Sequence, residues 1–254
     1  MRAEVCLLAG AGLLFASPTW AHVAPSEREN NRYILVAPLG DRIRLAYTVY
    51  MGQVPGRQAR QRMDANRDGR LDEGEARTYG EQVAAQVAPR LSLEVDGRPV
   101  AIQWQEIDVG LGQPIADAGA FAVDLIAWIC LEQPREQLAH RLHLRDRFHV
   151  PYPGETELRA EESPGVRITR SHLGTTPDTL RLDHRWTGGP GPAETSGYDL
   201  EFAVDPALAL FGGQACGAAP PGDDTRPWIL LVPAALAIAA GASMLIRMRR
   251  RRRT

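Results

Sequence analysis

The stretch RIRLAYTVYM, residues 42–51, alternates apolar and polar side chains with a period of two. In an extended chain successive side chains point to opposite faces, so this pattern is typical of a β-strand with one buried face. The side chains expected to face the core are Ile43, Leu45, Tyr47 and Val49, and those on the other face are Arg42, Arg44, Ala46 and Thr48. A strand of this kind needs neighbouring strands.

Further stretches supply those neighbours. LSLEVDGRPVAI, residues 91–102, carries the pair Asp96-Gly97 between two alternating runs, which is a strong hairpin signal. FAVDLIAWICL, residues 121–131, is apolar on both faces and is typical of a central strand. Other expected strands are RLHLRDRF (141–148), GVRITR (165–170), LRLDHRW (180–186) and YDLEFAV (198–204). About eight to ten short strands predict a mainly β protein, folded as an antiparallel β-sandwich.

One segment, residues 56–88, has helical spacing instead. Apolar side chains recur there at intervals of three and four residues, at Ala76, Tyr79, Val83, Ala84 and Val87, and Pro89 follows. We therefore expect a helical insertion between strands of the sandwich.

Both ends of the chain have the composition of targeting or anchoring segments. Residues 1–21 have a charged start, a short apolar stretch and small residues, as in a secretory signal peptide. Residues 228–246 carry no charge, and the 18 residues 229–246 would span roughly 27 Å as a helix, about one membrane core. Six arginines lie in the tail 247–254, so the positive-inside rule places that tail in the cytoplasm.

These ends predict a single-pass cell-membrane protein. An exported domain at 22–210, periplasmic or extracellular, is followed by a Pro/Gly-rich linker at 211–227. Between the signal and the tail lie 22 arginines and 30 acidic residues, a net charge of about −8, which argues against nucleic-acid binding. The chain has no lysine, which excludes P-loop and Schiff-base lysines. Because no nucleophile elbow, HExxH motif or paired-carboxylate set appears, we expect no enzyme and no catalytic residue.

The helical insertion contains DANRDGRLDEGE, residues 64–75. Oxygen-bearing groups stand at its first, third, fifth, seventh, ninth and twelfth positions, which are Asp64, Asn66, Asp68, Arg70, Asp72 and Glu75. Gly69 is sixth, where a sharp turn is needed, and the apolar Leu71 is eighth.

At every specified position this dodecapeptide resembles the EF-hand calcium-binding loop. The resemblance implies side-chain ligands from Asp64, Asn66 and Asp68, a backbone carbonyl from Arg70, a water-mediated contact from Asp72 and a bidentate carboxylate from Glu75. Ca²⁺ is the expected ion, because a bidentate glutamate suits sevenfold coordination and not the tight octahedron of Mg²⁺. Because the loop is single, we expect a structural site and not a signalling one.

The histidines and cysteines give weaker metal candidates. On a strand, His140 and His143 point to opposite faces, and His143 and His149 are roughly 20 Å apart, so a solvated face is expected. His22 could chelate copper if it became the mature N-terminus. Cys130 and Cys216 remain after removal of the signal, and whether they pair is left open.

Residues 22–110 also resemble, in the order of their elements, the exported N-terminal domains that precede some bacterial nickel/cobalt permeases. The permease itself has no counterpart in this chain. The C-terminus, with Cys216 in a Gly/Pro linker, an apolar span and arginines, is similar to cleaved bacterial sorting tails as well as to a permanent anchor. Two functions follow as expectations: a calcium-dependent binding or interaction module with a protein partner, or an accessory subunit of nickel/cobalt transport.

Overall fold

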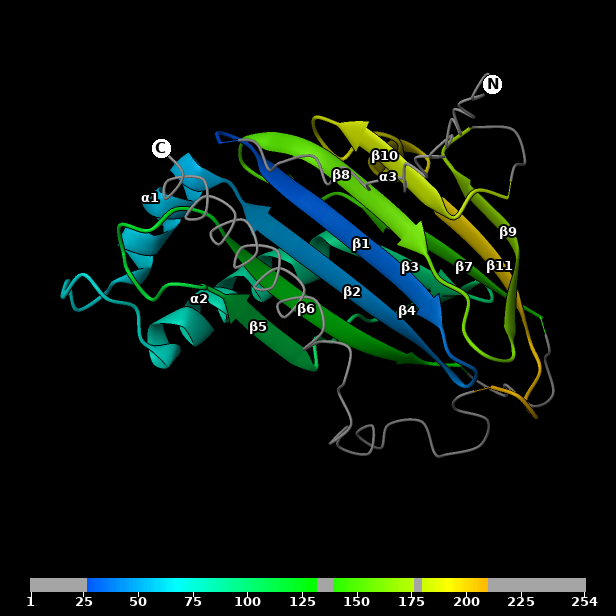
Figure 1. The fold of residues 1–254 in the computed structure, drawn as a ribbon. Coiled ribbons are helices and arrows are strands. Elements are labelled where there is room, and N and C mark those ends of the chain that lie inside the picture. Colours follow the sequence, from blue (N-terminus) through cyan, green and yellow to red (C-terminus); the bar gives the residue numbers. More distant parts are fainter. Residues whose placement is uncertain (1–26, 132–138, 176–179, 210–254) are drawn as a thin grey trace, which may run out of the picture. The chain divides into compact units, whose positions relative to one another are not determined.

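The computed structural model describes residues 27–131, 139–175 and 180–209. All of them belong to the first of two units, Met1–Gly213, the second being Gln214–Thr254. The expected signal peptide, linker, membrane span and basic tail lie outside the described residues. Within the described ranges, no helix is long and apolar enough to cross a membrane. The described part is mainly β, with two sheets and few helices, as the strand count predicts (Figure 1).

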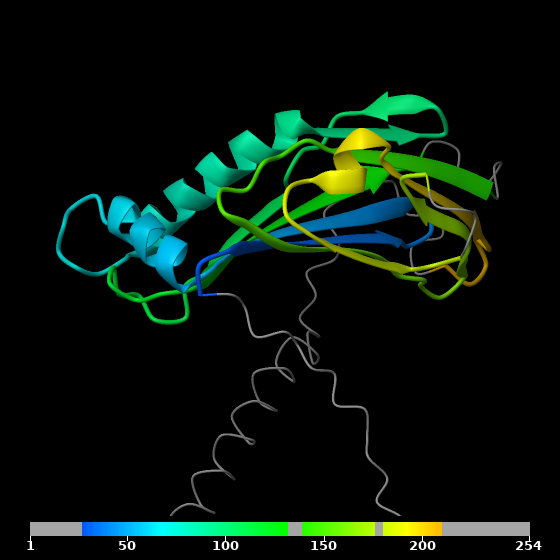
Figure 2. The same cartoon turned by 90° about the horizontal axis from the view of Figure 1, so that it is seen from above.

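The first sheet has six strands in the order β10-β8-β1-β2-β6-β5. Their bounds are β1 Asn30–Pro38, β2 Arg42–Met51, β5 Glu106–Gly110, β6 Phe121–Cys130, β8 Pro153–Ala160 and β10 Asp183–Thr187. The second sheet has the order β4-β3-β7-β11-β9. Its strands are β3 Leu91–Val95, β4 Arg98–Val100, β7 Ala139–Asp146, β9 Val166–Leu173 and β11 Tyr198–Val204. The two sheets form two layers around one apolar core (Figure 2).

The predicted core face of β2 is confirmed. Ile43, Tyr47 and Val49 have no exposed surface and Leu45 is 1% exposed. The predicted hairpin is confirmed as well: β3 pairs with β4, and Asp96 and Gly97 have φ angles of 52° and 76°. Two left-handed residues in a row match the twist of the paired strands, which explains why Asp-Gly occupies this turn.

The helical insertion begins earlier than residue 56. Helix α1 spans Gln53–Met63, α2 spans Glu73–Val87, and the 3-10 turn η1 (Ala88–Arg90) leads into β3; a short helix α3 (Gly191–Thr195) lies later in the chain. The apolar stripe of α2 packs on β5 and β6. The approach is close at Gly80, where a Cβ atom would lie 2.8 Å from Ile107 Cγ2 and 2.9 Å from Val109 Cγ2.

The expectation of purely antiparallel sheets is wrong at one pair: β1 and β8 run parallel. Strand β8 turns Gly154, Thr156, Leu158 and Ala160 inward, so its alternation is too weakly apolar to be recognised in the sequence. A parallel pair needs a long connection, and the chain from β2 to β7 provides it.

A buried ion pair joins the two sheets. Nη1 of Arg32 on β1 lies 2.7 Å from Oδ2 of Asp146 on β7 and donates to the carbonyl of Phe148 at 2.8 Å. The hydroxyl of Tyr47 donates to the same Asp146 oxygen at 3.0 Å. Both members of the pair are almost completely shielded from solvent, with exposures of 3% and 0%.

Candidate functional site

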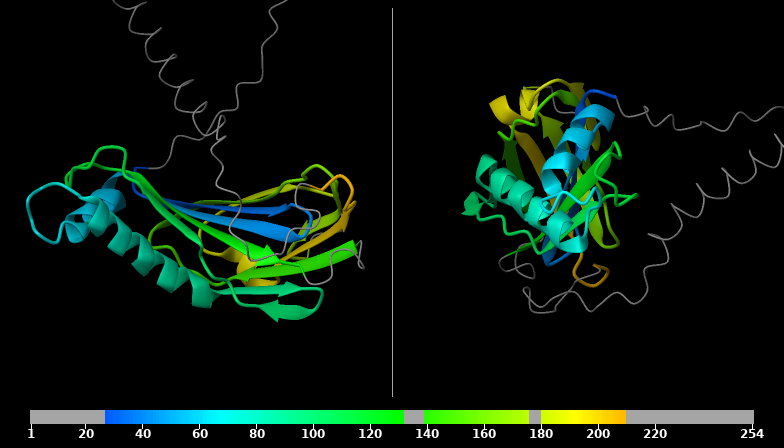
Figure 3. Two further views of the ribbon diagram at one scale, coloured as in Figure 1. Left: turned by 90° about the horizontal axis from the view of Figure 1, so that it is seen from below. Right: turned by 90° about the vertical axis from the view of Figure 1, so that its left-hand side faces the viewer.

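The predicted calcium loop connects α1 to α2 beyond one end of the sheets (Figure 3). Asp64 is the residue directly after α1. Asp72 caps the N-terminus of α2: its carboxylate accepts from the Glu75 amide at 2.8 Å, and the Glu75 carboxylate accepts from the Asp72 amide at 3.1 Å. This reciprocal capping box satisfies two backbone amides at the start of α2.

The first three oxygen-bearing side chains turn into the curl of the loop. Asp64 accepts hydrogen bonds from the amides of Asp68 at 3.1 Å and Gly69 at 3.0 Å. Asn66 Oδ1 accepts from the Asp68 amide at 2.9 Å, and Asp68 Oδ1 accepts from the Arg70 amide at 2.8 Å. The left-handed conformations of Arg67 and Gly69, with φ of 61° and 80°, let the chain wind tightly enough for this.

Glu75 closes the loop from the other side. Besides the Asp72 amide, its carboxylate accepts from the Ala65 amide at 2.8 Å and from the Asn66 amide at 3.4 Å. The twelfth residue of the motif therefore contacts the backbone beside the first and third. This places its oxygens at the mouth of the curl formed by Asp64, Asn66 and Asp68.

Arg70, the seventh residue of the loop, pairs with Ile115 through its backbone. It forms an isolated antiparallel bridge with Ile115, in which the Leu71 amide donates to the Pro114 carbonyl at 3.2 Å and the Ala116 amide donates to the Gly69 carbonyl at 3.1 Å. Because these bonds use the groups flanking Arg70, the amide and carbonyl of Arg70 itself point away from Ile115, and the amide donates to Asp68 Oδ1 at 2.8 Å. This is the carbonyl that the EF-hand resemblance assigns as a ligand.

The oxygen-bearing groups of the loop are of the type that a hard cation prefers, but their carboxylates accept hydrogen bonds from backbone amides in this conformation. Among the described ranges, no group of three or more His, Cys, Asp or Glu side chains is arranged to hold a metal ion. Asp72 serves as the N-cap of α2, and its expected water-mediated contact with an ion stays a prediction.

A second segment, residues 111–120, contacts the loop through the Arg70–Ile115 bridge, and the sequence did not predict this contact. Arg60, on α1, is 1% exposed. Its guanidinium donates to the carbonyls of Gly119 at 2.9 Å, Gln113 at 2.8 Å, Ala120 at 3.2 Å and Ile115 at 3.3 Å, and also to that of Leu111. Arg60 thus holds residues 111–120 in place, and that segment provides the bridge to the loop 64–75.

One signal for Arg60 was present in the sequence. Gly56, Ala59, Arg60 and Met63 follow at helical spacing and are all buried, so an arginine occupies the apolar face of α1. A charge at such a position needs many hydrogen-bond acceptors. Its carbonyl partners, 51 to 60 residues away, could not be identified from the spacing.

The histidines follow the predicted faces. His140 is buried, with Nδ1 2.8 Å from Asp96 Oδ2, whereas His143 lies on the outer face of β7 with Nδ1 2.9 Å from Asp199 Oδ1. His149 is exposed, 3.4 Å from Glu194. The sequence did not indicate that His172, on β9, lies 3.5 Å from Asp199. His22 and Cys216 are outside the described residues, and Cys130, at the end of β6, is disulfide-bonded.

Comparisons with known proteins add little. No protein-family model matches the chain, and no curated protein matches it. The structure is similar to a solved structure from Legionella pneumophila described as a "putative nutrient binding protein", at 9% identity over 72% of this chain and 69% of that chain, with a TM-score of 0.20. A likeness of this size carries no argument about this chain.

Proposed function

We propose that residues 64–75 bind Ca²⁺ and that the ion stabilises an exported, membrane-anchored binding or interaction module. The observation that carries the proposal is the helix-loop-helix itself. Its side chains at the first, third and fifth positions accept backbone amides within one tight turn, the Glu75 carboxylate accepts the Ala65 amide beside it, and the Arg70 carbonyl points away from Ile115.

The conformation of Glu75 bears on the strength of binding. Its carboxylate accepts backbone amides at both ends of the loop, and an ion would compete with those hydrogen bonds. An affinity in the range of extracellular modules, about 10⁻⁴ to 10⁻³ M, is therefore expected. External calcium would fill such a site and stabilise the fold by mass action.

Export and anchoring belong to the same proposal. The signal-like residues 1–21 and the uncharged span 228–246 support it, and the disulfide at Cys130 fits an oxidising compartment outside the cytoplasm. A reporter fused after residue 254 should be active only in the cytoplasm, and one fused near residue 213 only outside. The reverse pattern would contradict the proposed orientation, whereas loss of the tail from the mature protein would favour a cleaved sorting signal.

Isothermal titration of the full-length protein with Ca²⁺ tests the site. The variant Glu75→Gln removes the charge and the bidentate ligand, so its affinity should fall by more than about tenfold. Glu73→Gln is the matched control, because Glu73 is an exposed carboxylate in the same helical turn and outside the ligand set. Equal calcium binding by wild type and Glu75→Gln would show that the assignment is wrong.

The other candidate, an accessory role in nickel or cobalt transport, remains a prediction of the wider resemblance. The same titration with Ni²⁺ and Co²⁺ distinguishes the two functions, since an accessory subunit should prefer these ions to Ca²⁺.

A further inference from the structure

The outer face of the first sheet, the face turned away from the second sheet, has an apolar centre. On its three central strands, β1, β2 and β6, core side chains alternate with side chains that point outward. By contrast, the outward side chains of β7, β9 and β11 in the second sheet are mostly polar, as at Arg141, His172 and Asp199. Most outward side chains of the three central strands are apolar or aromatic and half-buried, and we call these the apolar strip: Tyr33, Leu35, Ala46, Tyr50, Ala122, Ile126 and Trp128.

The strip is continuous, and the described part of the chain leaves it uncovered. Leu35, Ala46 and Ile126 are direct neighbours across the three strands, and Trp128 lies one row further along β6. Figure 1 looks onto this face, and no helix or strand of the described ranges lies in front of it. Helix α2 packs on the inner side of the sheet instead, beside the core residues of β5 and β6.

Strand β6 gives the clearest sign that something else covers this face. A strand with apolar side chains on both faces is typical of a sheet that is buried on both sides. In β6 the inner side chains reach the core, whereas Ala122, Ile126 and Trp128 point outward. Half-exposed apolar side chains that are surrounded by polar ones are typical of an interaction surface. We therefore expect a partner on the strip.

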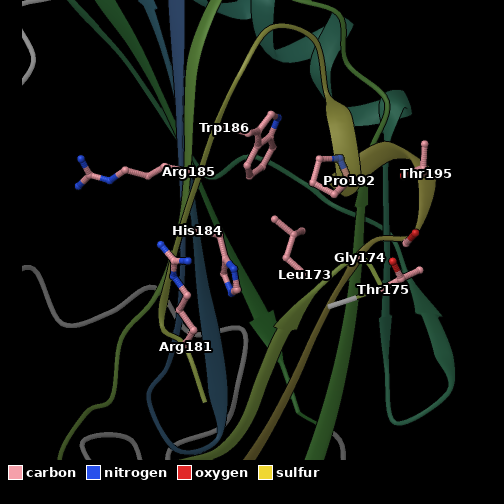
Figure 4. A pocket seen from close by; sticks show the side chains of 10 residues that line it. Leu173, Gly174, Thr175, Arg181, His184, Arg185, Trp186, Pro192 and Thr195 are labelled. Carbon is pink, nitrogen blue, oxygen red and sulfur yellow. The ribbon is translucent and has the colours of Figure 1, made fainter. Parts of the chain in front are cut away.

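The surroundings of the strip are acidic. A close-up of the pocket of about 330 Å³ between β10, β9 and α3 shows that Arg185 points away from His184 and Trp186, so its charge belongs to the outer face (Figure 4). The described residues of this face carry six carboxylates and three guanidiniums, a net charge of −3: Glu106, Asp108, Asp124, Glu155, Glu157 and Asp183 against Arg44, Arg159 and Arg185.

The negative charge is least balanced on the side of β5 and β6. On the opposite side of the strip, Arg185 pairs with Glu157 at 3.0 Å. Asp124, however, lies directly across from Asp108 in the pairing register, and its other neighbour is Thr48, which donates to it at 2.5 Å. Like charges directly opposite each other on two strands are unfavourable. A partner that brings positive charge to this side would relieve that repulsion.

The dimensions of the strip match those of one α-helix. Three neighbouring strands span about 10 Å, and the rows from Tyr50 to Trp128 span about 20 Å along the strands. A helix with its side chains is about 10–12 Å wide, and about 13 residues of it are 20 Å long. A second copy of this chain would instead bring the same acidic rim against this one.

We propose that the apolar strip is the docking site for a basic amphipathic helix of a partner protein. Its apolar side chains would lie on Leu35, Ile126 and Trp128, and its lysines or arginines would lie against Asp108 and Asp124. Such a helix forms a third layer on the sandwich. This names the surface and the partner chemistry of the interaction module proposed above and rests on that part of the proposal, but not on calcium.

A synthetic helical peptide of about 18 residues, built from leucine and lysine with one apolar face, is the probe. Fluorescence anisotropy of the labelled peptide measures its binding to the full-length protein. We expect a dissociation constant of about 10 µM, as for a small transient interface, and weaker binding at high salt. The control peptide has glutamate in place of lysine. If the basic peptide does not bind, or if both peptides bind equally, the proposal is overturned.

Two variants then locate the site. Asp124→Asn removes the charge and retains an acceptor for Thr48, whereas Ile126→Thr removes apolar surface and retains a β-branched side chain; each should weaken binding about tenfold. Glu94→Gln, an exposed carboxylate on β3 of the second sheet, is the matched control and should bind as wild type does. Wild-type affinity in both strip variants, or equal loss in Glu94→Gln, would place the peptide elsewhere and refute the assignment.

Other occupants of the strip give other results. Sedimentation that shows dimers of the wild type, dissociated by Ile126→Thr, would assign the strip to a second copy. Tryptophan quenching by brominated lipids that is reduced in Trp128→Phe would assign it to the membrane surface. Either result refutes a basic helix as the partner. The calcium titration with Glu75→Gln reports on the loop 64–75 alone, so failure of the peptide test and failure of the calcium proposal are distinguishable.

Discussion

Replacing Arg60 by methionine should loosen residues 111–120, the segment that supports the loop 64–75. Methionine preserves much of the apolar stem but removes a buried guanidinium that binds five backbone carbonyls between residues 111 and 120. Hydrogen bonds to a charged donor contribute about 1.5–3 kcal/mol each, but these contributions are not additive. Most residues of the segment 111–120 lie near the surface, so the carbonyls freed by the substitution can bind water. We therefore expect a loss of about 3–5 kcal/mol, equivalent to about two of these hydrogen bonds.

Thermal unfolding of the full-length protein measures this loss. At about 2–4 °C per kcal/mol for a domain of this size, the melting temperature of Arg60→Met should fall by roughly 6–20 °C. Hydrogen exchange should accelerate at the amides of Leu71 and Ala116, which form the bridge between loop and segment. Arg57→Met, an exposed arginine one turn earlier on α1, should change neither. An Arg60→Met protein that melts and exchanges as wild type does would refute the assigned role of Arg60.

Three further predictions concern the ion, the inter-sheet pair and pH. Adding chelator should lower the melting temperature without unfolding the sheets, because free Ca²⁺ at ~100 times the dissociation constant adds about 2.7 kcal/mol. Mg²⁺ should restore much less of this difference, and an unchanged curve would mean that the site is uncoupled from the fold. Asp146→Ala leaves the buried Arg32 charge without its carboxylate and should cost about 3–5 kcal/mol in urea denaturation, so an unchanged midpoint would contradict the role of the pair. The pKa of His184 is lower in the folded state, so the unfolded chain binds more protons and the free energy of unfolding falls as pH drops through the histidine range. Between about pH 7.5 and 5.5 the melting temperature should therefore fall less steeply with decreasing pH in His184→Gln than in wild type.

Local patterns in the sequence were sufficient for several elements. The core face of β2 followed from alternation, the β3–β4 turn from Asp96-Gly97, and the buried stripe of α2 from apolar spacing. The order of oxygen-bearing residues in 64–75 supplied the expected ligands of the loop, and that assignment stays a prediction. In each case the relevant contacts are between residues close in sequence, so the side-chain period and the preferred backbone conformation carry the information.

Features that depend on contacts between distant segments appeared only in the tertiary structure. The parallel pairing of β1 with β8, the carbonyl cluster around Arg60 and the Arg32–Asp146 pair each join residues more than fifty positions apart. The pocket between β10, β9 and α3 is a further case, because no short motif distinguishes His184 from a surface histidine. Sequence period determines which face of an element is buried, but not which other element covers it; that choice depends on how well the assembled surfaces pack and satisfy each other's polar groups.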